Sequence, residues 1–331
     1  MPRPSRRPSR ALAVLAALAP ALALGAGPGC QGGRDRPVLV FHASSLSRVL
    51  GEAERVLEAA DPRLDLVLEP SGSQVAARKL AELGRPADLV ISADWRVLDE
   101  LLEPAHAPWV LGLASNEIVL AYGEHSPGAA ELDAARWPSV LLRDGVRLGR
   151  VDPDTAPLGF QTLVVWELAA AALGPPDLAA RLVARCEPGR VVADAEELVA
   201  SLEARAVDYA FLQRNLVEEH RLQAVRLGPA LDLSRPERAA EYARVRVPVR
   251  LRAGEPPVSL PGAPAVYGLC VPRVATNPEG ALGLVRFLLS PEGRRALERS
   301  GFTPLPPALL AGRGLPPGLA ADPAPTGEGP R

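Results

Sequence analysis

Residues 38–50 read VLVFHASSLSRVL, and residues 64–83 read LDLVLEPSGSQVAARKLAEL. Each stretch begins with an apolar run of strand length, passes through a serine-containing turn, and ends in apolar residues at helical spacing. A third apolar run at 88–92 leads into another helical pattern at 95–102. This β-α-β-α-β-α order predicts a mostly parallel sheet covered by helices, which is an α/β fold.

The rest of the chain continues the alternation of strands and helices. A chain of 331 residues is too long for one ordinary domain and suits two. Residues 311–331 are rich in proline, glycine and alanine, and they predict a disordered tail. We expect further strands at 116–122, 147–151, 207–211, 245–251 and 265–271, and further helices at 163–173, 195–205, 278–289 and 291–300.

The N-terminus predicts export. Four arginines within the first ten residues precede an uncharged apolar run at 11–26, which is short for a membrane span and is interrupted by Pro20. This pattern is typical of a signal peptide, here residues 1–29. A small residue, Gly29, directly precedes Cys30, which predicts Cys30 as a lipidated first residue and 30–36 as a tether. The alternative is an ordinary signal peptide with Cys30 incidental. The location would be periplasmic or at the cell surface.

Removal of residues 1–29 would also change the net charge. Loss of four arginines leaves 33 basic and 39 acidic residues, a net charge of −6. If a chain with this net charge binds an anion, it must use local hydrogen-bond donors. Export argues against a nucleic-acid partner. Cys186 and Cys270 would lie in an oxidising compartment and could pair, although two buried free thiols fit their wide separation in sequence better.

Three strand-to-helix turns share one chemistry. They are 42–46 (HASSL), 70–74 (PSGSQ) and 152–160 (DPDTAPLGF). In an open α/β sheet such turns line one edge, where helix N-termini present unpaired N–H groups and serine hydroxyls add further donors. Together these groups would form an uncharged cage of donors for an anion. The alternative is that each serine caps its own helix, which would explain any single turn.

Short motifs along the chain place these turns in a wider pattern. In order and spacing, from about Val38 to Pro304, the motifs resemble the molybdate/tungstate-binding proteins of ABC importers, and especially their tungstate-binding branch. The motifs are HASSL at 42–46, SGS at 71–73 followed by Arg78 and Leu80, ADLVISAD at 87–94, NEIVLAY at 116–122, DYAF at 208–211, YGLCVP at 267–272, FLLSPEG at 287–293 and GF at 301–302.

The resemblance implies a type II periplasmic binding protein, in which two α/β lobes are joined by two hinge strands. Lobe I would comprise 37–115 and 273–310, and lobe II would comprise 116–272 with the hinge strands at its ends. The implied function is capture of molybdate or tungstate and delivery to a membrane permease, by a monomer without cofactor, metal site or catalytic residue. The implied ligand-binding residues are Ser44, Ser45, Gly72, Ser73, Ala156, Leu158, Ala195 and Tyr209.

Two departures from the tungstate-binding branch leave the ligand open. Thr155 and Ala156 stand where that branch has paired aspartates, and Leu212, followed by Gln213, stands where it has a glutamate. Without these acids a tetrahedral anion would be held by hydrogen bonds alone. Molybdate, tungstate, sulfate, phosphate and a small organic anion therefore remain alternatives.

Two other classes of function use the same chain differently. A hydrolase on this scaffold would use Ser45 with His42, but the two residues share one turn and no acid is placed to orient the histidine. A regulatory or sensory domain without a transporter is the other alternative.

Overall fold

The computed structural model describes residues 37–186 and 188–319. All of them belong to one compact unit, Arg34–Arg331. The predicted signal peptide, Cys30 and the tether lie outside the described residues, as does the end of the predicted tail from residue 320.

The first sheet, in lobe I, contains the strands quoted at the outset. β1 runs parallel to β2 on one side and to β3 on the other, as the repeated strand–turn–helix pattern predicts. β12 lies antiparallel between β3 and β4, and the strand order is β13-β4-β12-β3-β1-β2, with β14 also pairing with β4. The strands are β1 (Val38–Ala43), β2 (Leu66–Ser71), β3 (Leu89–Ser92), β4 (Trp109–Ser115), β12 (Val266–Cys270), β13 (Thr303–Pro304) and β14 (Leu309–Gly312).

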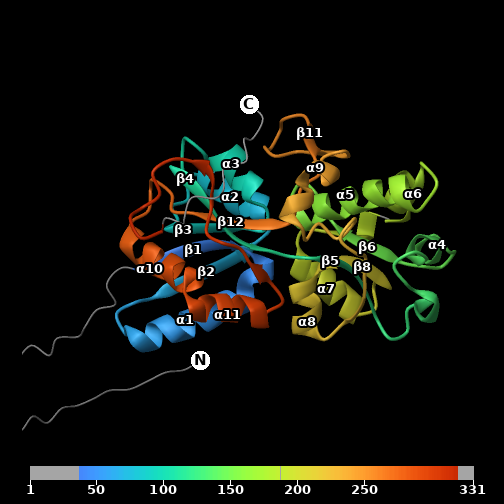
Figure 1. Cartoon of the computed structure of the whole chain (residues 1–331), viewed down its shortest axis with the longest axis horizontal. Helices are drawn as coiled ribbons and strands as arrows, with labels where there is room; N and C mark the ends of the chain where they lie inside the picture. The colour runs from blue at the N-terminus through green and yellow to red at the C-terminus, as the bar shows by residue number, and fades with distance from the viewer. Residues whose placement is uncertain (1–36, 187, 320–331) are drawn as a thin grey trace, which may run out of the picture. The chain divides into compact units, whose positions relative to one another are not determined.

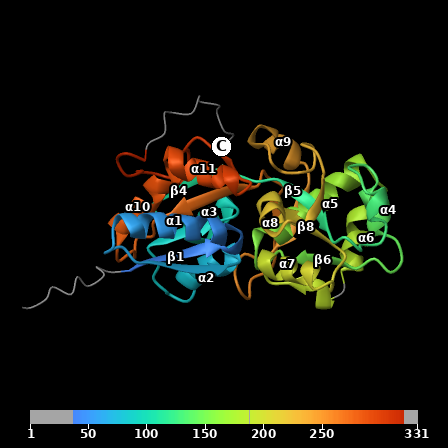
Figure 2. The same ribbon diagram turned by 90° about the horizontal axis from the view of Figure 1, so that it is seen from below.

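Helices cover both faces of this sheet. In Figures 1 and 2, α1, α10 and α11 lie on one side of the strands, and α2 and α3 lie on the other. α1 buries Val49, Leu50 and Ala53, which recur at helical spacing. The helices are α1 (Ser47–Ala60), α2 (Ser73–Ala81), α3 (Trp95–Leu102), α10 (Pro278–Leu289) and α11 (Pro291–Arg299), and the 3-10 turn η1 (Ser44–Leu46) precedes α1.

The second sheet, in lobe II, has the order β7-β6-β8-β5-β9. β6 is parallel to β7 and β8, whereas β5 is antiparallel to β8 and β9. Trp137 and Trp166 pack edge-on against Phe211 at 5.2 and 5.8 Å between ring centroids, which places an aromatic cluster at the centre of this core. The strands are β5 (Ile118–Tyr122), β6 (Leu148–Val151), β7 (Val191–Val192), β8 (Tyr209–Gln213) and β9 (Gln223–Arg226).

The helices of lobe II include the one that follows the third predicted turn. α5 begins at Pro157, earlier than the predicted start at 163, because proline is well suited to the first turn of a helix. A hairpin, β10 (Arg246–Val249) and β11 (Val258–Pro261), forms a separate two-stranded sheet. The helices are α4 (Trp137–Leu141), α5 (Pro157–Ala172), α6 (Leu178–Arg185), α7 (Ala195–Glu203), α8 (Arg214–His220) and α9 (Ala239–Tyr242), with short 3-10 turns η2 (Ala129–Glu131), η3 (Pro188–Arg190) and η4 (Pro236–Arg238).

Two short segments connect the sheets. The first runs from the end of β4 to the start of β5, and the second precedes β12; they meet where Asn116 N donates to Ala265 O at 3.0 Å. The predicted boundary of lobe II at 272 is corrected by this topology, since β12 pairs within the first sheet and the chain has already returned to lobe I at Val266. β12 is buried throughout, and a continuous apolar run does not reveal which sheet it joins.

The predicted tail also begins too early. β14 pairs with β4 through Leu309, Ala311 and Gly312, and Leu319 is buried. The composition of this segment predicted disorder because it is rich in proline and glycine, but composition does not register backbone pairing with a neighbouring strand.

Cys186 and Cys270 are both buried free thiols. Burial raises the pKa of Cys186 to about 11 and also raises that of Cys270, so both stay protonated. Within the described ranges, no helix combines the length and the apolar character that crossing a membrane requires.

Candidate ligand-binding site

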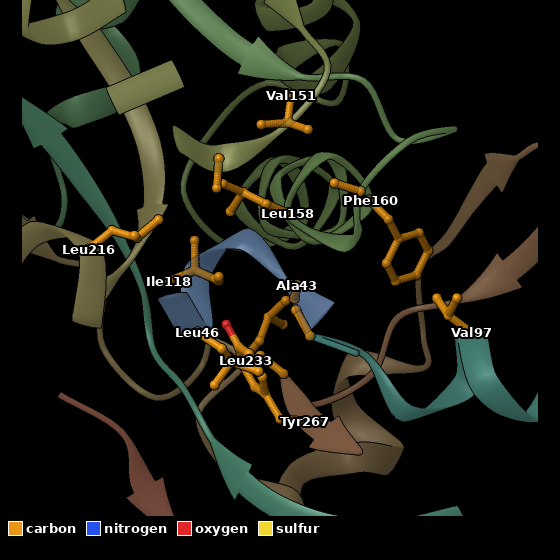
Figure 3. Packing of buried hydrophobic residues seen from close by; sticks show 14 of the residues in the cluster. Ala43, Leu46, Val97, Ile118, Val151, Leu158, Phe160, Leu216, Leu233 and Tyr267 are labelled. Carbon is orange, nitrogen blue, oxygen red and sulfur yellow. The ribbon is translucent and has the colours of Figure 1, made fainter. Parts of the chain in front are cut away.

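The three predicted turns meet at one small cavity between the lobes. Its free volume is about 10 Å³, far below the roughly 300–1,000 Å³ of pockets that take drug-sized molecules. In the closed form this cavity has no room for a large solute. Figure 3 shows Leu158, at the start of α5, facing the turn that carries Ala43 and Leu46. The cavity is lined by Ala43, Ser44, Ser45, Ser71, Gly72, Ser73 and Ala93 of lobe I and by Ala156, Pro157, Leu158, Ala195 and Gln213 of lobe II.

Seven of the eight predicted ligand-binding residues are therefore together in space. Contact of these residues with a ligand stays a prediction, but their convergence from positions up to 151 residues apart is a fact of the fold. They are Ser44, Ser45, Gly72, Ser73, Ala156, Leu158 and Ala195.

Tyr209 is the exception and is a correction to the predicted set. It begins β8, whereas Gln213, which lines the cavity, ends the same strand. Four residues of strand separate them by roughly 13 Å. The Tyr209 hydroxyl donates instead to Pro127 O at 2.6 Å. The motif DYAF locates the strand in the chain but does not tell which of its ends meets the site.

The serines of the cavity do not cap helices. The residue that precedes η1 is Ala43, the one that precedes α1 is Leu46, and the one that precedes α2 is Gly72, and none of these makes a side-chain capping bond. Capping was the alternative explanation of the serine-rich turns, and the geometry does not support it. Ser44, Ser45 and Ser73 thus keep their hydroxyls for other partners.

Open helix N-termini add backbone donors. α5 follows Ala156, which likewise has no capping side chain, and its first residue is a proline without an N–H, so Leu158 carries the first N–H of that helix. At α7 the capping Asp194 accepts from Glu197 N at 3.0 Å and leaves the N–H of Ala195 without a cap bond. α2 and α5 therefore begin at the cavity without a side-chain cap, and α7 begins there with a cap that does not bond the N–H of Ala195.

Two of the serine hydroxyls have defined partners. Ser73 Oγ accepts a hydrogen bond from Ala93 N at 3.0 Å, and Ser45 Oγ lies 2.9 Å from the Tyr267 hydroxyl. A hydroxyl that accepts from an N–H still holds its own proton. Ser73 can therefore donate into the cavity while its lone pair is held by the backbone.

The cavity wall is uncharged, since none of its twelve lining residues is acidic or basic. A bound anion would be met by the positive ends of helix dipoles and by hydrogen-bond donors rather than by cations. The described residues also contain no cluster of three or more His, Cys, Asp or Glu side chains placed to hold a metal ion.

Gln213 is a lining residue that sequence reasoning missed. It is buried, its Nε2 donates to Gln161 Oε1 at 3.3 Å, and its Oε1 has no partner among the described residues. An amide exchanges its donor and acceptor ends by a half-turn. The available signal was its position, because Gln213 ends a buried strand directly before a helix.

Contacts across the cavity hold the lobes together. Gln74 Nε2 of lobe I donates to Pro153 O at 3.0 Å, and Asn215 Nδ2 of lobe II donates to Ser45 O at 2.7 Å. A Cβ added to Gly72 would lie 2.3 Å from Thr155 O of lobe II. The structure therefore shows a closed arrangement in which backbone meets backbone beside the cavity.

His42 does not form a catalytic pair with Ser45. Its Nδ1 lies 3.0 Å from Ala43 O, and its Nε2 has no partner within the described part of the chain. Burial lowers the pKa of His42, so the ring is neutral. The hydrogen bond that would activate Ser45 as a nucleophile is therefore not formed between these two side chains.

Comparisons with known proteins agree with this geometry. Residues 38–303 match the family model described as bacterial extracellular solute-binding protein. A solute-binding protein of Petrotoga mobilis is 34% identical, with 80% of this chain and 82% of that protein covered. The molybdate/tungstate-binding protein WtpA of Thermococcus kodakarensis is 30% identical, with 79% and 80% covered.

Solved structures confirm the predicted fold. The periplasmic molybdate-binding protein of Azotobacter vinelandii superposes with a TM-score of 0.60 at 14% identity, with 80% of this chain and 98% of that one covered. The sulfate-binding protein SubI of Mycobacterium tuberculosis superposes with a TM-score of 0.55 at 13% identity, with 82% and 88% covered. Two α/β lobes around an interlobe cavity, together with the family match over most of the chain, place this protein in the family of bacterial extracellular solute-binding proteins.

Proposed function

We propose that the protein is the receptor of an ABC importer and captures a tetrahedral oxyanion, molybdate or tungstate, between its lobes. One observation carries the proposal: an uncharged cavity is lined from both lobes by hydrogen-bond donors, namely serine hydroxyls, the uncapped N-termini of α2 and α5, and the first residue of α7. The choice of anion is supported by a relative named molybdate/tungstate-binding protein at 30% identity.

The donors would replace hydrogen bonds that the anion makes with water. Each hydrogen bond to a charged oxygen contributes roughly 1.5–3 kcal/mol. Ser45 and Ser73 would donate from lobe I, and Leu158 N and Ala195 N from lobe II. In this arrangement the anion takes the place of the missing N-caps of α2 and α5, and it interacts with the positive ends of the helix dipoles.

The wall of the cavity favours a tetrahedral ion. No carboxylate lines it, so the central atom of a bound oxyanion gains no protein ligand and keeps its four oxygens. At the positions where the tungstate-binding branch has acids, Ala156 lines the wall and Leu212 is fully buried in the core. Sulfate and phosphate share the tetrahedral shape, so selection among these ions depends on size and on protonation, because a ligand O–H facing a protein donor is unfavourable.

Binding and closure are coupled. The donors come from both lobes, so only the closed form makes the complete set of hydrogen bonds, and the anion selects that form. We propose that the closed, monomeric receptor then docks on the permease and releases the anion when the lobes separate.

Thermal unfolding tests the proposed ligand. Molybdate or tungstate at about a thousand times Kd is expected to stabilise the chain by about 4 kcal/mol, which raises Tm by several degrees. The variant Ser73→Ala loses one donor and is expected to bind roughly tenfold or more weakly. Ser139→Ala, on the exposed surface of α4, serves as the matched control. Equal shifts for Ser73→Ala and wild type would contradict the role of the Ser73 hydroxyl.

We also propose that Cys30 anchors the exported protein to a membrane through a lipid. The support is the sequence alone, in which small Gly29 precedes Cys30 after an apolar run. Cys30→Ser is expected to move the protein from the membrane fraction to the soluble exported fraction, measured by fractionation and immunoblotting. Retention of the variant in the membrane fraction would contradict the anchor.

A further inference from the structure

Tyr267 is linked to the cavity wall by a hydrogen bond to Ser45. It lies on β12, is fully buried, and its hydroxyl is 2.9 Å from Ser45 Oγ. Tyr267 does not itself line the cavity. Burial raises the pKa of Tyr267 to about 12, so the phenol keeps its proton. Figure 3 shows its ring in the core that also holds Leu46 and Leu233.

The position of the Tyr267 ring is defined by its surroundings. The register between β12 and β4 shifts between Tyr267 and Gly268, and such a bulge re-aims the side chain beside it. Phe302 packs edge-on against the ring at 5.1 Å. A Cβ on Gly268 would lie 2.6 Å from Trp95 Cβ, so glycine is needed for the strand to approach α3. The hydroxyl is thereby held at the Ser45 turn.

The burial of Tyr267 sets the direction of the hydrogen bond. Ser45 Oγ is the hydrogen-bond partner of the Tyr267 hydroxyl in the described part of the chain, and a fully buried phenol leaves its proton unpaired unless it donates to that partner. Ser45 lines the cavity, so its own proton has a second direction open to it. Beside this pair, Asn116 Oδ1 accepts from Glu117 N at 2.8 Å and Asn116 Nδ2 donates to Asn215 Oδ1 at 2.7 Å.

The direction of this hydrogen bond matters for an anion. If Tyr267 donates to Ser45 Oγ, the serine proton is free to point into the cavity. If Ser45 donated to Tyr267 instead, the serine would present lone pairs to the anion, which is repulsive. Asn215 of lobe II meanwhile holds the backbone of the same serine through Ser45 O, at 2.7 Å. Asn116 lies where the chain crosses between the sheets, so the network joins the crossover to a donor of the site.

We propose that Tyr267 is a positioning residue, which donates to Ser45 and turns the serine proton toward the bound anion. The inference rests on the proposed function, because it requires a ligand oxygen that accepts. The hydrogen bond from Tyr267 makes Ser45 a donor to an unprotonated ligand oxygen. Tyr267 does this without touching the ligand.

A double-mutant cycle tests this role. Wild type, Tyr267→Phe, Ser45→Ala and the double variant, each as the full chain from residue 31, are titrated with molybdate by calorimetry. Each single variant is expected to lose affinity roughly tenfold. Tyr267→Phe is expected to change affinity less than about twofold in the Ser45→Ala background, because its effect passes through the Ser45 hydroxyl. Tyr242→Phe, which removes a buried hydroxyl bonded to Pro229 O far from the cavity wall, is the matched control and should retain wild-type affinity.

The outcomes separate the two proposals. Losses that add in the double variant would show that Tyr267 acts through the packing of the lobe, and would overturn its role as a positioning residue. An unchanged affinity of Tyr267→Phe would overturn it as well. No binding of molybdate, tungstate, sulfate or phosphate by the wild type would overturn the proposed function and the inference together.

Discussion

Replacement of Gly72 by alanine is expected to reduce oxyanion affinity by about two orders of magnitude while leaving the ligand-free chain as stable as the wild type. The added Cβ would lie 2.3 Å from Thr155 O and 3.0 Å from Ala156 Cβ, both of lobe II. The backbone of Gly72 itself, at φ −60 and ψ 143, is ordinary for alanine. The clash therefore exists only when the lobes are closed. The substitution makes closure of the lobes less favourable and leaves the open form unchanged.

Calorimetric titration with molybdate measures the affinity of Gly72→Ala. Thermal unfolding without ligand measures its stability. Gly51→Ala is the matched control, since its Cβ would meet no atom within 4 Å and its position in α1 is remote from the cavity. Gly51→Ala should bind as the wild type does and be slightly more stable. Wild-type affinity in Gly72→Ala would contradict the closed arrangement as the binding form.

Gly159→Ala is expected to do the opposite, and to destabilise the chain by about 3 kcal/mol or more. Its Cβ would lie 2.5 Å from Pro153 N and 2.6 Å from both Asp152 C and Val151 O. All three are backbone atoms of lobe II, so opening the lobes gives no relief. The first turn of α5 would have to move away from the β6 strand end, which would also displace Leu158 N from the cavity.

Denaturant unfolding measures this effect through the transition midpoint. Gly283→Ala in α10 is the control, because its Cβ would meet nothing within 4 Å and helical alanine is more favourable than glycine by about 1 kcal/mol. A midpoint of Gly159→Ala equal to that of the wild type would contradict the close packing of α5 on the third turn.

Local pattern was sufficient to predict much of the site. The serine turns after β1 and β2 could be predicted because apolar runs end abruptly at small polar residues and helical spacing follows at once. β1 and β2 are parallel neighbours that end at one sheet edge, so convergence of their two turns follows from the fold class. The third turn follows β6 of the other sheet, so its meeting with the first two depends on how the lobes face each other, and α5 begins six residues before the predicted start.

What the sequence could not predict depends on contacts between distant segments. The sheet to which β12 belongs is decided by pairing with β3 and β4, and the apolar run of β12 fits either lobe. Which end of β8 meets the cavity is decided by the position of lobe I, so Tyr209 was assigned to the site and Gln213 was not. The Tyr267–Ser45 bond joins residues 222 positions apart, and the pairing of β14 is likewise non-local.

The central claim is that an uncharged cage of donors from both lobes binds a tetrahedral oxyanion. Isothermal titration of the chain from residue 31 with molybdate, tungstate, sulfate and phosphate in turn tests it most directly. We predict sub-micromolar binding of molybdate or tungstate, equivalent to more than about 8 kcal/mol, with sulfate bound at least roughly a hundredfold more weakly. Absence of heat with all four anions would contradict the claim, and the protein would then be a solute-binding protein for a different ligand.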